Sequence, residues 1–350
     1  MDLSLQTFIT NIVTNPFFLL CSLLTLAVNT LNGKTLAPNS VATSISTRAV
    51  TPRTGVFIVV TGNFLGLLIM TLVNASVANA MFGIADFGND PHNALIALSG
   101  GLIAFTVWQF ISTHFGIPSS GSHALISSLS GAAIASMGSF SALNGKEWIK
   151  VFIGLVTSPL LGFTFGLVFA KFLRFMFRNS NRIIANKFFK WAQISGSFAN
   201  AFMNGAHDGQ KFLGVFLIGM SLVQGGGKAS AIPIWLIILC ALAMSFGASM
   251  CSIKTVKAVG MDMVKLEVYQ GFASDFATVS CILIASLTGI PVSATHTKTC
   301  SILGVGAAKR FSAVKWTAIK TMVTGWVLTF PVCGTIGYLA AKGLLLIFGI

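Results

Sequence analysis

The segment NAFMNGAHDGQK, residues 200–211, places an aspartate between two apolar stretches of a chain that has only eight acidic residues. A carboxylate at bilayer depth costs at least about 2.5–3.5 kcal/mol on insertion scales, so such residues usually mark ion or proton pathways. We therefore expect Asp208 to bind Na⁺ or a proton, together with the oxygen of Asn204. We also expect Gly205 and Gly209 to break the helix here and to free backbone carbonyls as further ligands. The alternative is an aspartate in a water-exposed glycine-rich loop.

A second acidic residue, Asp275, lies in the apolar segment YQGFASDFATVSCILIAS. We expect it to be buried in the membrane, with a helix end at the membrane interface as the alternative. The remaining acidic residues lie in segments that read as loops or interfacial regions.

Two further segments could bind an anion: GIPSSGSHALISSLSGAAIA at 116–135 and GIPVSATHTKTCSILGVGAA at 289–308. Both read Gly-Ile-Pro-x-Ser-x-Ser/Thr-His, and proline and serine are favoured where helices begin. The free N–H groups and dipole of a helix start form an anion site. Two such starts could face each other across one anion; the residues concerned are Ser119, Ser120, Ser122, Ser293 and Thr295. The alternative is that each serine simply caps a helix.

The histidines that end these motifs, His123 and His296, fit either role in such a site. Each could contact the ligand directly or hydrogen-bond the residues that do.

The two motifs belong to an internal duplication. LNGKTLAPN at 31–39 resembles MNGAHDGQK at 203–211, and the spacing from Gly33 to Pro118 is 85 residues against 86 from Gly205 to Pro291. Homologous halves are typical of secondary transporters, whose substrate sites lie where the halves meet. We expect an N-terminal repeat at 1–170, a basic cytoplasmic linker at 171–190 and a C-terminal repeat at 191–350.

The composition requires a membrane. The 350 residues are 54% hydrophobic and 9% charged, with a mean hydropathy of +0.85, whereas soluble domains carry about 25% charged residues. Roughly nine to eleven segments approach the length and apolarity of a span, and long runs without alternation indicate helices. The net charge of +14 reflects short basic loops that orient the protein in the bilayer, so we expect no nucleic-acid binding.

These segments resemble the inorganic phosphate transporters of the Pit type, which are cation-coupled phosphate permeases. The resemblance rests on PNSVATSISTRAVTPR, MNGAHDGQKFLGVFLIGM, KAVGMDMVKLEVYQGFASD and the two Gly-Ile-Pro segments. It implies an all-α polytopic membrane protein with two inverted homologous repeats, each with a re-entrant helical hairpin. The substrate-binding residues that it implies are Ser119, Ser120, Ser122, Ser293, Ala294, Thr295, Asn39 and Asp208. The cation-binding residues that it implies are Asp208, Asn39, Asp275, Gly33, Gly205 and Asn204, supported by His123, His296, His207 and Gln210.

The chain also departs from the family pattern. Leu36 stands where the family carries an aspartate, and His207 stands in place of an asparagine. Gly121 and Ala294 replace hydroxyl residues of the hairpins. One of two symmetry-related carboxylates is therefore missing, which leaves the number of coupled cations open.

Together these features favour import of phosphate across the cell membrane by symport with Na⁺ or H⁺, without a further cofactor. The alternatives are a permease for sulfate or another tetrahedral oxyanion, a degenerate paralogue that binds phosphate without moving it, and an anion channel. A membrane-embedded enzyme is disfavoured because HExxH, GxSxG and metal-spaced His or Cys clusters are lacking. Whether the protein forms a homodimer stays open.

Overall fold

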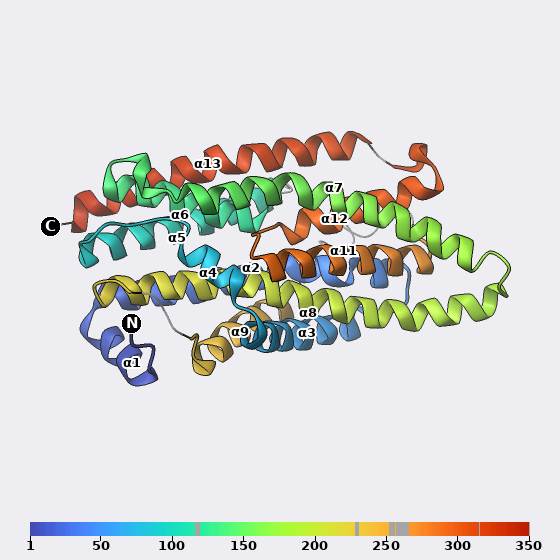
Figure 1. Ribbon diagram of the computed structural model, residues 1–350, viewed down its shortest axis with the longest axis horizontal. Helices are drawn as coiled ribbons and strands as arrows, with labels where there is room; N and C mark the ends of the chain where they lie inside the picture. Colours follow the sequence, from blue (N-terminus) through green and yellow to red (C-terminus); the bar gives the residue numbers. More distant parts are fainter. Residues whose placement is uncertain (116–119, 228–230, 252–255, 257–265, 315, 350) are drawn as a thin grey trace.

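The described chain is almost entirely helical (Figure 1). The computed structural model describes residues 1–115, 120–227, 231–251, 256, 266–314 and 316–349. Within them lie twelve α-helices and no named strand, so the predicted all-α class is confirmed. The α-helices are α1 Leu5–Thr14, α2 Pro16–Ser46, α3 Pro52–Val73, α4 Ser76–Phe82, α5 Pro91–His114, α6 Gly121–Met137, α7 Gly145–Met176, α8 Arg182–Val223, α9 Ile234–Ser249, α11 Val268–Thr288, α12 Ala294–Lys309 and α13 Trp316–Phe348. Two 3₁₀ turns, Phe140–Ala142 and Phe311–Ala313, precede α7 and α13.

The helices form an elongated bundle whose two chain ends lie at the same end (Figure 1). Six helices in the described residues are long and apolar enough to cross a membrane, and α9 is a shorter apolar helix. This is fewer than the nine to eleven segments expected. The difference has a simple cause: α6, α9 and α12 are only 17, 16 and 16 residues long, and α8 carries many polar residues.

The two halves exchange packing partners. In the first half, α2 packs on α9 and α7 packs on α11 and α12 of the second half. In the second half, α8 packs on α3, and α13 packs on α5 and α6 of the first. Every contact thus has a counterpart in which the halves trade places, as expected of a duplicated chain. The inverted orientation, the re-entrant nature of the hairpins and the boundaries at 170 and 190 stay predictions.

Three helix segments are buried on every side. Residues 203–221 of α8, 122–133 of α6 and 296–307 of α12 are buried without interruption. A helix that is enclosed all round belongs to the interior of a bundle. Polar groups on these segments must therefore find partners inside the protein.

The expected helix breaks at Gly205 and Gly209, and the loosened backbone at Gly33, are wrong. Both α2 and α8 continue through these positions, so their carbonyls stay within the helical hydrogen-bond pattern. The glycines serve close packing instead. A Cβ on Gly205 would lie 2.2 Å from the Asn63 carbonyl oxygen of α3, and one on Gly33 would lie 2.1 Å from the Met244 carbonyl oxygen of α9.

Replacement of Gly205 by alanine should destabilise the bundle. The added methyl forces the backbones of α3 and α8 apart, and overpacking of this kind costs about 1–3 kcal/mol. A matched change, Gly343→Ala in α13, meets open space and should leave the melting temperature unchanged or raise it. Thermal unfolding of the detergent-purified variants measures the difference. Equal melting temperatures for the two variants would contradict this account of the glycines.

Candidate functional site

Each repeated motif starts a helix with a serine cap, as predicted. Ser120 caps α6 and accepts the His123 N–H at 3.3 Å, and Ser293 caps α12 and accepts the His296 N–H at 3.3 Å. The N–H groups of the first helical residues have no acceptor within the helix, which is the basis of anion binding at such ends. Ser119 lies outside the described residues.

The two helix starts lie together in the interior. The rings of His123 and His296 contact each other edge to face, with centroids 4.9 Å apart. Phe330 stacks on His123 and Trp326 stacks on His296, both from α13. Neither histidine ring has a hydrogen-bond partner among the described residues. The predicted meeting of the two motifs is therefore present, with the histidines packed between helices at the junction.

A buried ion pair lies beside the start of α6. Asp208 and Lys211, one turn apart on α8, are 2% and 1% exposed, and the Lys211 ammonium contacts the Oδ1 of Asp208. Lys211 Nζ also donates to Ser122 Oγ at 2.5 Å and to the Val292 carbonyl at 2.8 Å. Ser122 in turn donates to Asp208 Oδ1 at 3.2 Å. One side chain of α8 thus joins the start of α6 to the segment that leads into α12.

The first half makes the equivalent contact without charge. Asn39 of α2 donates from Nδ2 to Thr295 Oγ1 of α12 at 3.0 Å. A shift of 172 residues carries Asn39 to Lys211, and a shift of 173 carries Ser122 to Thr295. The same shift of 172 carries Leu36 to Asp208. One half therefore has an apolar residue and an amide where the other has a carboxylate and an ammonium.

Other predicted residues support these segments. His207 approaches the backbone of Val292 at 3.2 Å and Ser286 Oγ at 2.9 Å, which fixes the chain before α12. Asn204 donates to Ser40 Oγ at 2.9 Å, and Gln210 donates to the Asn74 carbonyl at 2.8 Å. Ala294, the first residue of α12, is buried with the helix start.

Asp275 forms a separate cluster. It is fully buried in α11, so the alternative of an interfacial helix end is wrong. Its Oδ1 contacts the Lys298 ammonium of α12 and accepts from Thr43 Oγ1 of α2 at 2.9 Å and from Asn200 Nδ2 of α8 at 3.4 Å. No hydrogen bond or ion pair found in the described residues joins this cluster directly to Asp208.

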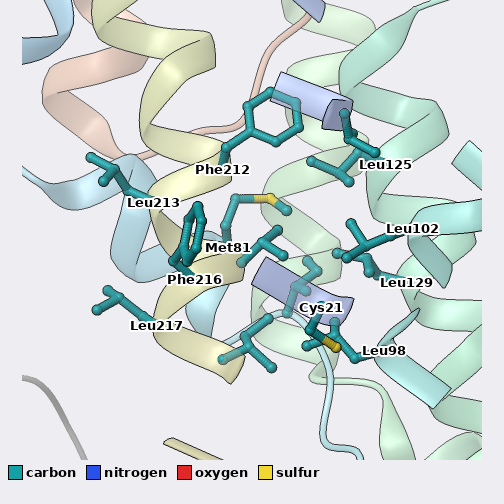
Figure 2. Packing of buried hydrophobic residues seen from close by; sticks show 14 of the residues in the cluster. Cys21, Met81, Leu98, Leu102, Leu125, Leu129, Phe212, Leu213, Phe216 and Leu217 are labelled. Atoms are coloured by element: carbon teal, nitrogen blue, oxygen red, sulfur yellow. The ribbon is translucent and has the colours of Figure 1, made fainter. Parts of the chain in front are cut away.

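The repeat has an apolar counterpart of this second pair. The shift of 173 carries Asp275 to Leu102 and Lys298 to Leu125. These leucines belong to the main hydrophobic cluster, where side chains of α5 and α6 face those of α8 (Figure 2). One fold therefore holds an ion pair at one position and two leucines at its duplicate.

The two lysines were the functional residues that sequence reasoning missed. Lys211 stands three residues after Asp208, the spacing that places two side chains on one face of a helix. Lys298 follows the second motif by two residues in an apolar stretch. A basic residue in a segment destined for the interior is as costly as an acidic one, and this cost was the available signal.

Comparison with known proteins identifies the family. A model described as the phosphate transporter family matches residues 32–337. The chain belongs to the phosphate transporter family. It is 34% identical over 326 residues to a Bacillus subtilis protein named "probable low-affinity inorganic phosphate transporter", covering 92% of this chain and 96% of that one. A protein of the same name from Rhizobium meliloti is 33% identical, with 93% and 96% covered.

A solved structure shares the fold. The structure titled "The sodium-dependent phosphate transporter" superposes with a TM-score of 0.83 over 95% of this chain and 100% of that one, at 23% identity. Family membership together with six apolar spans makes the chain a multi-pass plasma membrane protein. It also confirms the transporter class over the enzyme alternative, since the relatives are named as transporters.

Removal of Lys298 alone should destabilise the protein strongly. Lys298→Leu leaves Asp275 charged and unpaired in the interior, a change that typically costs about 3–5 kcal/mol. The double variant Asp275→Leu/Lys298→Leu copies the leucine pair of the first half and should recover most of that loss. Thermal unfolding in detergent compares the three proteins. A double variant as unstable as the single one would contradict the repeat argument.

Proposed function

We propose that this chain imports inorganic phosphate by symport with a cation, Na⁺ or H⁺, through alternating access of its two halves. The observation that carries the proposal is the contact of His123 with His296, which holds the starts of α6 and α12 together. Two helix starts supply N–H donors and positive dipole ends from both halves to a single anion. Thr295, whose Oγ1 accepts from Asn39, keeps its own hydroxyl hydrogen available for such an anion.

The local acceptors favour phosphate over sulfate. Phosphate near neutral pH carries a protonated oxygen that needs an acceptor, whereas sulfate carries none. Asp208 Oδ2 is buried and has no hydrogen-bond partner among the described residues, while Oδ1 is taken by Lys211 and Ser122. A buried carboxylate oxygen without a partner is costly unless a ligand satisfies it.

Coupling follows from the cost of import. Moving a divalent phosphate inward against a potential of about 100 mV costs about twice 2.3 kcal/mol. Each cation that enters with it returns about 2.3 kcal/mol. The contacts from Asn39 to Thr295 and from Lys211 to Ser122 each join one half to the other. Rocking of the halves would make and break such contacts as the site opens to either side.

Asp208→Asn should abolish uptake of labelled phosphate into proteoliposomes while the protein still folds. The change removes the acceptor for the phosphate proton and the countercharge of Lys211. Glu147→Gln is a matched control, because Glu147 pairs with Lys150 at the same helical spacing on the surface; it should transport normally. A folded Asp208→Asn protein that transports at the wild-type rate would overturn the role of Asp208.

Competition tests the anion. A large excess of sulfate should leave uptake of labelled phosphate nearly unchanged in the wild type, because sulfate cannot donate to Asp208 Oδ2. Strong inhibition by sulfate would instead support a general oxyanion permease. Phosphate binding to folded protein without uptake under either an inward Na⁺ or an inward H⁺ gradient would support the degenerate paralogue.

A further inference from the structure

The oxygens expected to bind a coupling cation already surround one. Lys211 Nζ is held by Asp208 Oδ1, by Ser122 Oγ at 2.5 Å and by the Val292 carbonyl at 2.8 Å. Carboxylate, hydroxyl and backbone carbonyl oxygens are the ligands that a hard cation takes. The three partners match the three N–H donors of an ammonium group, so none of its donors is left over.

The second buried carboxylate has the same arrangement. Lys298 Nζ contacts Asp275 Oδ1 and lies 3.5 Å from Thr43 Oγ1. The buried charged side chains of the described residues are these two aspartates and these two lysines, paired one to one. Neither carboxylate is therefore left as an unneutralised anion of the kind that attracts a metal ion from water.

We propose that Lys211 is a tethered cation that takes the place of a Na⁺ ion beside Asp208, so that this site binds no Na⁺ and phosphate uptake does not require it. An Na⁺ ion could enter only by displacing an ammonium that has three hydrogen bonds and remains attached nearby. The two positive charges would then share one buried carboxylate. The part of this inference that concerns uptake rests on the proposed function; the part that concerns the site does not.

The duplicate half suggests how to open the site. Asn39 stands at the position equivalent to Lys211 and contacts Thr295 as Lys211 contacts Ser122. Lys211→Asn should therefore fit the backbone and leave an empty set of hard oxygens: the Asp208 carboxylate, the Asn amide oxygen, Ser122 Oγ and the Val292 carbonyl. The site differs from that of the sodium-dependent neighbour in fold only if Na⁺ is shown not to bind here, and this can be measured without transport.

Thermal unfolding of detergent-purified protein tests the site, with NaCl titrated against choline chloride at constant ionic strength. The wild-type melting temperature should not respond specifically to Na⁺. The melting temperature of Lys211→Asn should rise with Na⁺ concentration, because a ligand that binds the folded state stabilises it. Asp208→Asn/Lys211→Asn should lose that response. Lys150→Asn, which breaks a surface pair at the same spacing, should show none.

A Na⁺-dependent rise in the wild type that Asp208→Asn removes would overturn the inference. A folded Lys211→Asn protein without any Na⁺ response would overturn it too, because the oxygens would then not form a cation site. If Lys211→Asn does not fold, the wild-type comparison still decides, together with Asp208→Leu/Lys211→Asn, which copies Leu36 and Asn39 of the first half and should show no response.

Labelled phosphate uptake supplies the second arm. Wild-type proteoliposomes at fixed pH should take up phosphate equally with external Na⁺ or choline, and an inward Na⁺ gradient should give no stimulation. Stimulation by Na⁺ would contradict the inference while supporting symport. Absence of uptake under every gradient would instead reject the proposed function and leave the thermal result to judge the site.

Discussion

The structure depends on one electrostatic constraint: a charge inside this apolar bundle must have a partner there. Water is absent from the interior of α6, α8 and α12, so an isolated carboxylate or ammonium would carry its full desolvation cost. The chain meets this constraint by placing a lysine beside each buried aspartate. Because the partners of Lys211 come from α8, α6 and the segment before α12, neutralising Asp208 also fixes how three elements meet.

Close approach of the helices makes these short contacts possible. Glycines let the α8 backbone touch α3 and the α2 backbone touch α9, so polar groups on buried faces come within hydrogen-bond distance. The exchange of packing partners then brings each hairpin under the last long helix of the other half. The two helix starts meet as a consequence of this exchange, with the histidines and the aromatic residues of α13 filling the space around them.

Much of this organisation could be predicted from residue types and spacing. The all-α class follows from apolar runs without alternation, the duplication from two motifs at matched spacing, and the serine caps from the preference of Ser120 and Ser293 for helix starts. The conformation around Gly205 could not be predicted. Glycine permits either a helix break or a close helix contact, and the choice depends on Asn63 of α3, 142 positions away in the chain.

The charge pairs lie between these cases. The pairing of Asp208 with Lys211 is readable from helical spacing, whereas that of Asp275 with Lys298 depends on how α11 and α12 pack. The duplication adds information that a single copy lacks, because it shows that the same fold accepts Leu102 and Leu125 where the other half has an ion pair. Charge at these positions is therefore not demanded by the fold, which makes function the simplest reason for its presence at Asp208.

The central claim is that phosphate binds where α6 and α12 begin, between the two halves. A cryo-electron microscopy map of the protein with saturating phosphate, compared with a map without it, tests this most directly. The account predicts added density at the two helix starts, in contact with Ser122, Thr295 and the free oxygen of Asp208. Added density elsewhere in the bundle, with the helix starts unchanged, would contradict it.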